Sequence, residues 1–210
     1  MAQRSPTHSL DGRSRDGAGI VIPLRSFTHG KARLAAVLDE AARAALARAM
    51  AERVIGAAGM RPVVVVSSAP DVVAWASEHE LAVIDDPGSL DGAADAGRAW
   101  VRARGLGRIV VVHADLPLAS SLDRVAGDGP APVAVVVPDH RDDGTPVLSL
   151  PSATPFAFSY GPGSAARHID EARRRGLDVR VLRDAALGFD VDIEDDLHVL
   201  EALRNQSHSR

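Results

Sequence analysis

The sequence contains no cysteine among its 210 residues, so disulfide bonds and thiolate metal sites are excluded. Aromatic residues make up only 3% of the chain, which leaves Ala, Val, Leu and Ile to build the hydrophobic core. With so few aromatic side chains, stacking platforms for single-stranded nucleic acid are not expected. Neither a disulfide scaffold nor a single-strand binding surface fits this composition.

The sequence also lacks an excess of basic residues and a long apolar run. The net charge of −4 argues against nucleic acid as the main partner, because binding to the phosphate backbone needs a basic surface. No apolar run approaches the roughly 20 residues that span a bilayer. The first 19 residues lack the hydrophobic core of a signal peptide. We therefore expect a cytoplasmic protein with no membrane association.

The length suits one well-buried domain and is short for two ordinary ones. Residues 1–18 are polar, rich in Gly, Ser and Arg, and without period, which predicts a disordered leader. Residues 205–210 are similar and predict a disordered tail. One domain is expected over residues 19–204, and no internal repeat interrupts it.

Within this domain, apolar runs alternate with helical stretches. Strands are expected at 19–24, 62–67, 81–84, 108–113, 132–138, 147–150 and 177–182. Helices are expected at 40–58, 70–79, 92–104, 163–175 and 194–204. The alternation predicts an α/β fold with a mostly parallel sheet flanked by helices, whose ligands bind beyond the carboxyl ends of the strands.

A cationic loop, PLRSFTHGKARL, follows the first expected strand. It carries Arg25, Lys31 and Arg33, which suit the binding of a nucleotide triphosphate at this end of the sheet. The glycine spacing of a Walker loop is absent. An ordinary solvated basic loop is the alternative, and the chemistry of the loop alone does not exclude it.

Acidic residues follow two other strands. Asp115, in HADLPL, is placed to hold Mg²⁺ through one carboxylate and several waters, or to act as a turn or capping residue. Asp190 and Asp192 stand at positions i and i+2, so in an extended segment they face the same way. Two like charges held together are costly without a cation, and we favour a metal site there. The acids at 194–196 are assigned to helix capping and solvation.

The last motifs are the tripeptide Gly144-Thr145-Pro146 and the segment YGPGSAARH at 160–168. The second opens a helix whose free N–H groups, with the Ser164 hydroxyl, form an anion site. Plain helix capping with a proline near the start explains the same residues. His168 is expected to be a packing or capping residue rather than a base. Zinc-ligand spacing, a Gly-x-Ser-x-Gly elbow and a dinucleotide Gly-x-Gly-x-x-Gly are all absent, and the last absence rejects a dehydrogenase.

Taken in order, these segments resemble the 2-phospho-L-lactate or phosphoenolpyruvate guanylyltransferases of coenzyme F-420 biosynthesis. The resemblance covers residues 20–203 and is carried by PLRSFTHGKARL, HADLPL, GT, YGPGSAARH and FDVDIEDDL. It implies a single Rossmann-like nucleotidyltransferase domain of the GT-A type, similar to the molybdenum-cofactor guanylyltransferases. The implied reaction transfers GMP from GTP to a phosphorylated three-carbon acid and releases pyrophosphate.

The resemblance also implies roles for individual residues. Three aspartates would hold Mg²⁺, with Mn²⁺ as an alternative, and would be catalytic together with Lys31: Asp115, Asp190 and Asp192. Three residues would line the pocket for the acceptor acid: Thr145, Gly161 and Ser164. Three cations would face the GTP phosphates: Arg25, Lys31 and Arg33.

Two positions depart from the family pattern. Arg25 stands where the family usually has Lys, and Pro146 stands where many relatives have Asn. Pro146 lacks both an amide side chain and a backbone donor close to the implied acceptor pocket. Two alternatives stay open: a transferase of this fold with another phosphorylated or sugar-like acceptor, and a non-catalytic GTP-binding relative. A homodimer is a further option that the sequence leaves open.

Overall fold

The computed structural model describes residues 17–28, 30–127 and 129–208. Its strands are β1 (Ala18–Pro23), β2 (Val63–Val66), β3 (Ala82–Ile84), β4 (Arg108–Val112), β5 (Val133–Val137), β6 (Val147–Pro151) and β7 (Asp178–Val181). Its helices are α1 (Glu40–Ala58), α2 (Pro70–Glu78), α3 (Leu90–Ala103), α4 (Asp123–Ala126), α5 (Ser164–Arg174) and α6 (Glu194–His208), with a 3₁₀ turn η1 (Ala32–Leu34).

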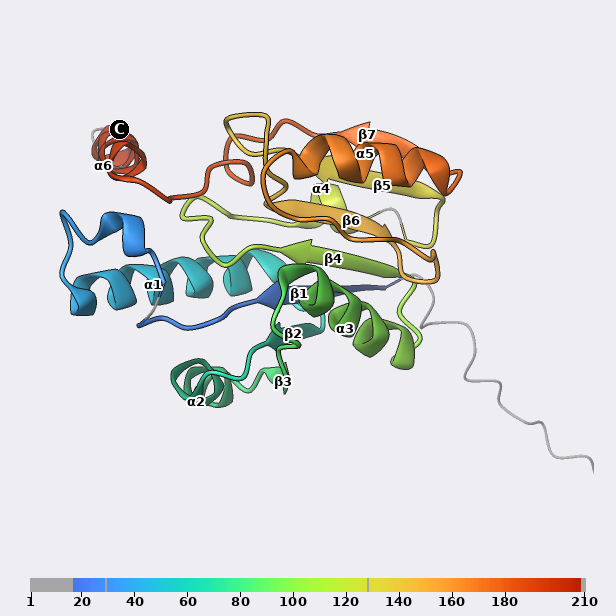
Figure 1. The fold of residues 1–210 in the computed structure, drawn as a ribbon, viewed down its shortest axis with the longest axis horizontal. Coiled ribbons are helices and arrows are strands. Elements are labelled where there is room, and N and C mark those ends of the chain that lie inside the picture. The colour runs from blue at the N-terminus through green and yellow to red at the C-terminus, as the bar shows by residue number, and fades with distance from the viewer. Residues whose placement is uncertain (1–16, 29, 128, 209–210) are drawn as a thin grey trace, which may run out of the picture.

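The strands form one sheet in the order β3-β2-β1-β4-β6-β5-β7 (Figure 1). Only β6 is antiparallel to its neighbours β4 and β5, and the other described pairings are parallel. The expected mostly parallel, mixed sheet is thus confirmed. In the register, Val147 at the start of β6 pairs with Val112 and Val137 at the ends of β4 and β5. The segment before β6 therefore lies at the same sheet edge as the segments that follow β4 and β5.

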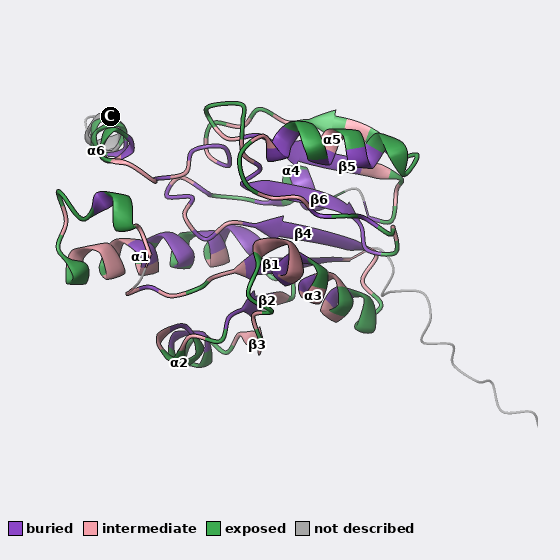
Figure 2. Cartoon of the chain, viewed as in Figure 1, coloured by how far each residue is buried: buried purple, intermediate pink, exposed green. Residues whose placement is uncertain are grey.

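Both faces of the sheet are covered by helices, so the central strands are buried throughout (Figure 2). Alternation along β1 shows the two layers. Ile20 and Ile22 pack with α1, α2 and α4, whereas Val21 packs with α3 on the opposite face. Because both faces need apolar side chains, the strands read as continuous valine-rich runs rather than as alternating ones.

Helix α3 lies unusually close to β1, and a glycine permits the approach. A Cβ atom built on Gly97 would lie 2.2 Å from Cγ1 of Val21, a distance that no side chain tolerates. The helix begins at Leu90, two residues before the expected start, because the Ser89 hydroxyl accepts a hydrogen bond from the backbone N–H of Gly92 and caps it. This cap fixes the α3 end of the cavity described below.

The expected domain limits differ in detail from the described elements. Ala18, placed in the leader, already belongs to β1, and α6 continues to His208 beyond the expected limit at residue 204. Residues 1–16 and 209–210, which hold the rest of the expected leader and tail, lie outside the described residues. Within the described ranges, no helix is both long and apolar enough to cross a membrane.

Candidate active site

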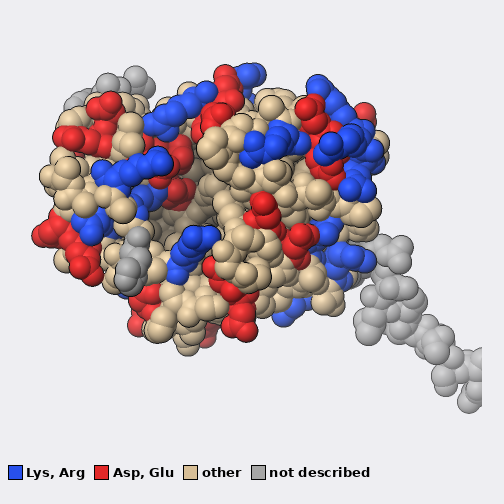
Figure 3. All heavy atoms as spheres, in the orientation of Figure 1, with Lys and Arg blue, Asp and Glu red and all other residues tan. Residues whose placement is uncertain are grey.

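A cavity of about 390 Å³ opens at the carboxyl edge of the sheet. Residues from the ends of β1, β2, β3 and β4 line it together with Asp192 and the first residues of α3. On the face shown in Figure 3, acidic atoms lie inside a hollow and basic atoms lie at its edges. A cavity at this edge, with charges of both signs, matches where α/β sheets of this kind bind ligands.

Three carboxylates converge beside this cavity. Asp115, Asp190 and Asp192 each offer an oxygen, and these oxygens all lie within 4.8 Å of one another. Val191, between the last two, is fully buried against Leu34 and other apolar residues from η1, α1 and α6. Because successive side chains of an extended segment point in opposite directions, the burial of Val191 turns both neighbouring aspartates toward Asp115. The convergence expected from the i, i+2 spacing is observed.

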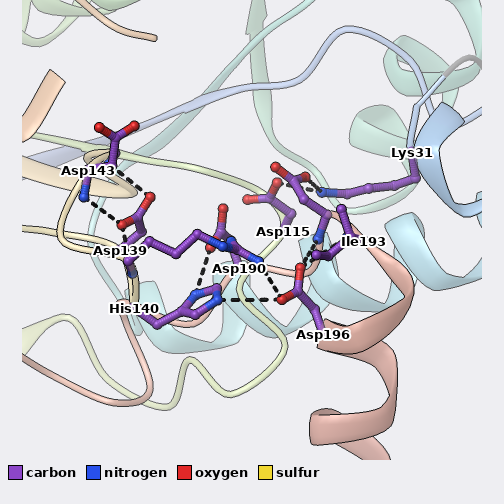
Figure 4. A network of polar contacts seen from close by, with 11 residues as sticks. Lys31, Asp115, Asp139, His140, Asp143, Asp190, Ile193 and Asp196 are labelled. Atoms are coloured by element: carbon purple, nitrogen blue, oxygen red, sulfur yellow. Dashed lines mark hydrogen bonds and ion pairs between the residues drawn. The ribbon is translucent and has the colours of Figure 1, made fainter. Parts of the chain in front are cut away.

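Lys31 joins two of these carboxylates (Figure 4). Its Nζ lies 2.6 Å from Oδ2 of Asp115 and 2.8 Å from Oδ1 of Asp192. The residue adopts a left-handed backbone conformation, with φ of 56°, at the start of η1. Burial alone would lower the pKa of Lys31, but Asp115 and Asp192 raise it above its ordinary value. Lys31 was expected to face the GTP phosphates, and here its ammonium group sits among the acids.

The acidic cluster fits a hard divalent cation. Oδ1 of Asp115 and Oδ1 of Asp190 are buried and accept no hydrogen bond within the described part of the chain, although Nδ1 of His140 lies within ion-pair distance of the Asp190 oxygen. Burial, followed by the charges of Asp115 and Asp192, raises the pKa of Asp190. Carboxylate oxygens are the ligands that Mg²⁺ and Mn²⁺ prefer, and a cation would offset the repulsion among the acids, which adds to the effect of burial on the pKa of Asp190.

Asp196 fixes the backbone that carries two of the acids. Its Oδ2 accepts hydrogen bonds from the backbone N–H groups of Asp192, at 2.8 Å, and Ile193, at 3.0 Å. Its Oδ1 pairs with the guanidinium of Arg141 at 2.7 Å. Burial would raise the pKa of Asp196, but these amide donors and Arg141 lower it. The capping role expected for Asp196 is confirmed.

His140 and Arg141 are members of the site that the sequence analysis missed. Nδ1 of His140 lies 3.3 Å from Oδ1 of Asp190, and its Nε2 lies 3.4 Å from Oδ1 of Asp196 (Figure 4). Both residues follow β5, so they sit at the same sheet edge as the acids. The only signal for them is their position directly after an apolar strand, as for Asp115.

The two arginines of the first loop differ in position. Arg25 lines the cavity, and its Nη2 donates a hydrogen bond to the carbonyl of Gly88 at 3.2 Å. Arg33 is exposed on η1 and is not among the described residues that line the cavity. Of the three cations predicted to act together, the structure brings Arg25 and Lys31 to one cavity and leaves Arg33 outside it.

Thr145 and Ser164 form a buried pair whose hydroxyl oxygens lie 3.0 Å apart. Nδ1 of His168 lies 3.1 Å from the Thr145 hydroxyl, and the backbone N–H of Ser159 donates to Nε2 of His168 at 3.0 Å. His168 is thus a buried, hydrogen-bonded residue, as expected. Neither hydroxyl is among the described groups that line the cavity. Gly161, the third residue implied for the acceptor pocket, has a φ of +99°, which glycine tolerates.

Comparison with known sequences gives a consistent result. The family described as "Guanylyl transferase CofC like" matches residues 18–210. A phosphoenolpyruvate guanylyltransferase of Rubrobacter xylanophilus is 39% identical over 191 residues, covering 87% of this chain and 92% of the relative. A 2-phospho-L-lactate guanylyltransferase of Methanothermobacter thermautotrophicus is 32% identical, covering 90% of this chain and 86% of the relative.

The fold of this chain is similar to that of solved nucleotidyltransferase structures. A nucleotidyl transferase from Methanothermobacter thermautotrophicus superposes with a TM-score of 0.66 at 14% identity, covering 91% of this chain and 99% of the other. A 4-diphosphocytidyl-2C-methyl-D-erythritol synthase from Anaerococcus prevotii superposes with a TM-score of 0.60 at 9% identity, covering 91% and 100%. At these identities the likeness shows the nucleotidyltransferase fold alone. The family match over residues 18–210 and the 39% identical relative show that this protein belongs to the CofC-like guanylyl transferase family.

Proposed function

We propose that this protein is a guanylyltransferase that moves GMP from GTP to a phosphorylated three-carbon acid, phosphoenolpyruvate or 2-phospho-L-lactate, with release of pyrophosphate. The observation that carries the proposal is the convergence of Asp115, Asp190 and Asp192 beside Lys31 at the edge of a cavity. Family membership and the names of the relatives supply the nucleotide and the acceptor class.

The lining of the cavity suits a nucleotide. Apolar groups from Leu24, Val66 and Leu90 offer a surface for a base and ribose, whereas Arg25 and Lys31 offer positive charge for phosphates. Parallel strands bring Val66, Leu24 and Asp115 to one edge of the sheet, because these residues lie at or after the ends of β2, β1 and β4, which are neighbours in that order. We infer that the base lies toward β2 and that the α-phosphate lies toward Asp115.

The reaction does not require a strong general base on the protein. At neutral pH the acceptor phosphate is already ionised, and one of its oxygens attacks the α-phosphorus of GTP as the bond to the β-phosphate oxygen breaks. The chain has to overcome repulsion between anions and align them. Lys31 and Arg25 would reduce this repulsion, and the three aspartates would hold a divalent cation, which polarises phosphoryl oxygens when bound.

The proposed acceptor site lies beside the segment that precedes β6. Thr145, Gly161 and Ser164 are the residues that we propose for it, and the chemistry of two hydroxyls suits an acidic group. Pro146 directly follows Thr145, and its carbonyl accepts a hydrogen bond from the backbone N–H of His113 at 2.9 Å. The proline therefore forms part of the edge between β4 and β6, next to the proposed acceptor residues.

The first test is pyrophosphate release with Mg²⁺ and GTP against phosphoenolpyruvate, 2-phospho-L-lactate and 3-phosphoglycerate in turn. We expect release with GTP and one of the first two acids, and none with ATP or CTP. Release with none of the acids, from a folded protein that binds GTP, would favour another acceptor or a non-catalytic relative. Repeating the assay with Mn²⁺, and with a chelator, identifies the metal requirement.

Replacement of the acids tests the metal assignment. Asp115→Ala and Asp192→Ala should each lower turnover by about a hundredfold or more, because each removes a carboxylate from the site of charge development. Asp170→Ala, which removes an exposed carboxylate of α5, is the matched control and should leave turnover unchanged. Near-normal turnover in both site variants would rule out the assignment.

A further inference from the structure

The cationic loop between β1 and η1 touches the cavity at both of its ends. It leaves the cavity wall after Ser26 and returns to it at Gly30 and Lys31. These ends approach each other closely, because a Cβ atom built on Gly30 would lie 3.1 Å from the carbonyl oxygen of Ser26. Arg25 and Lys31, the two cations of the cavity lining that we propose for the GTP phosphates, are therefore carried by one compact loop.

A carboxylate of α2 binds the middle of this loop. Oδ2 of Asp71 accepts hydrogen bonds from the backbone N–H groups of Phe27, at 2.9 Å, and Thr28, at 3.3 Å. The same oxygen accepts a hydrogen bond from the Ser26 hydroxyl at 3.1 Å. The other oxygen, Oδ1, accepts from the backbone N–H of Val72 at 3.0 Å. One carboxylate oxygen thus serves the loop and the other serves the start of α2.

The side chain of Phe27 anchors the loop at the same point. It is fully buried, and its ring packs edge-on against Trp75 of α2, with ring centroids 5.2 Å apart. The guanidinium of Arg48, from α1, lies 4.7 Å from the centroid of the Phe27 ring. The loop therefore runs between α1 and α2 (Figure 1). Packing of Phe27 fixes where the loop lies, and the hydrogen bonds to Asp71 fix the orientation of its peptide groups.

A role in α2 alone does not account for Asp71. An acidic side chain in the first turn is favourable for any helix, because the helix N-terminus is partly positive. That role uses one oxygen, whereas the other accepts its hydrogen bonds from residues 43 to 45 positions earlier in the chain. Burial would raise the pKa of Asp71, but the donors at Phe27, Thr28 and Ser26 lower it. The contacts with the loop are therefore made by an ionised carboxylate, which strengthens them.

We propose that Asp71 is a positioning residue for nucleotide binding, which holds the cationic loop so that Arg25 and Lys31 line the cavity before GTP binds. The inference rests on the proposed function and adds to it a residue of α2, a helix that contributes none of the described residues of the cavity lining. A loop without this anchor would have to be ordered when GTP binds, and the lost conformational freedom would weaken binding. With Asp71 in place, the loop is already ordered in the folded protein.

Asp71→Asn tests the proposal with almost no change in side-chain size. Asparagine has one acceptor oxygen and one NH₂ donor, so it cannot accept hydrogen bonds from the loop and from Val72 at once. The KM for GTP should rise about tenfold, as for a lost hydrogen bond to a charged group. The kcat at saturating GTP and the KM for the acceptor acid should stay within about twofold of the wild type, because bound GTP orders the loop again. An unchanged KM for GTP would overturn the proposal.

Asp184→Asn is the matched control. Oδ1 of Asp184 accepts hydrogen bonds from the backbone N–H groups of Ala186, at 3.0 Å, and Leu187, at 3.2 Å. None of these three is among the described residues that line the cavity. The variant makes the same change of charge and removes the same kind of hydrogen bond, so it should lower the melting temperature similarly and leave the KM for GTP unchanged. An equal rise in both variants would reduce the effect to charge or stability and would contradict the role of Asp71.

Hydrogen exchange measures the order of the loop without catalysis. The amides of Phe27 and Thr28 should exchange faster in Asp71→Asn than in the wild type, and added GTP should slow them again. The same amides in Asp184→Asn should exchange at the wild-type rate. If the two amides exchange equally in Asp71→Asn and the wild type, Asp71 does not hold the loop and the inference fails.

These measurements separate the inference from the proposed function. If the wild type turns over GTP with an acid and Asp71→Asn has the same KM for GTP, the inference fails and the guanylyltransferase proposal stands. If the wild type shows no turnover with any acid, the proposed function fails, and calorimetric titration with GTP still tests Asp71. Binding of GTP about tenfold weaker in Asp71→Asn would then support its role, and an equal Kd would overturn it.

Discussion

The hydrogen bonds of His168 determine which of its ring nitrogens carries the proton. Because the N–H of Ser159 donates to Nε2, that nitrogen carries no proton in the neutral ring, and the proton sits on Nδ1. Nδ1–H then donates to the Thr145 hydroxyl. Protonation of Nε2 would place two donors against each other at the amide of Ser159. The network in this form therefore requires a neutral imidazole.

The stability of the protein should reflect this requirement. Burial, followed by the charges of Arg167 and His113, lowers the pKa of His168 from 6.5 to about 4. The unfolded chain then binds a proton at higher pH than the folded one, so stability is present above pH 6.5 and is lost as the pH falls toward 4. The full loss is on the order of 3 kcal/mol.

We expect His168→Asn to show a flatter dependence of unfolding free energy on pH between 6.5 and 4, because the titrating group is gone while a donor toward Thr145 remains. Urea unfolding across this range measures it. His198→Asn, which replaces an exposed histidine of α6, should keep the wild-type slope. An unchanged slope in His168→Asn would show that other groups control acid unfolding.

At the scale of elements, the direction of β6 decides which segments meet. A parallel β6 would carry Thr145 to the opposite edge of the sheet, far from Asp115. The antiparallel register instead pairs Val147 with Val112, so the GT motif lies beside the HADLPL segment. A single reversed strand thus brings the proposed acceptor residues to the edge that holds the acids.

Helix α6 depends on Asp196, and so does the segment before it. In Asp196→Asn the backbone N–H groups of Asp192 and Ile193 lose a charged acceptor, and Arg141 loses its partner. We expect a loss of about 1 kcal/mol of stability, as for a lost helix cap. Weaker Mn²⁺ binding by titration calorimetry should accompany it, because the acids become less well ordered.

Asp195→Asn provides the comparison for Asp196→Asn. It makes the same change of charge one residue earlier on an exposed position. If both variants weaken Mn²⁺ binding equally, the effect is one of net charge and not of backbone order.

The sequence predicted the regular elements well because each has a long local signal. Valine-rich runs marked β2, β4 and β5, and an N-cap at Asp39 marked α1. The turns η1 and α4 are too short to show a period, and neither was predicted. The strand β6 was predicted, but its direction has no local signal and depends on which strands it joins.

For the candidate site, too, the features with a local sequence pattern were predicted and those that depend on distant segments were not. The facing of Asp190 and Asp192 follows from the period of an extended chain and was predicted. The pairing of Lys31 with Asp115 and Asp192 joins segments far apart in sequence, so no local pattern indicates it. His140 was missed for the same reason, since its contact with Asp190 exists only after folding.

At the scale of the whole molecule, Arg108 holds the two halves of the sheet together from inside. Its side chain is fully buried at the start of β4. The guanidinium donates to the carbonyls of Gly129, Ala131 and Val133 and to the hydroxyl of Ser149. One guanidinium thereby supplies hydrogen bonds to carbonyl groups in and just before β5 and to a hydroxyl of β6. These acceptors would otherwise lack donors in the interior.

Arg108→Met should lower the free energy of unfolding by about 3 kcal/mol or more, because it leaves several buried acceptors without a donor. The measurement is thermal or urea unfolding, with Arg102→Met as an exposed control on α3 that should change stability little. The KM for GTP of the remaining folded protein should stay near the wild-type value, since Arg108 is not among the described residues that line the cavity. Wild-type stability in Arg108→Met would contradict this account.

The pairing of Lys31 with Asp192 closes a loop across 161 positions of the chain. We expect contacts of such long separation to form late in folding, because closing a longer loop costs more chain entropy. Both tryptophans, Trp75 and Trp100, belong to the half of the chain that is made first, whereas Asp190 and Asp192 lie near its end. An intermediate with a packed first half can therefore give a native-like fluorescence signal while it has no complete acidic cluster. We expect the cluster to be completed only when α6 docks, so that activity should return after the fluorescence signal during refolding.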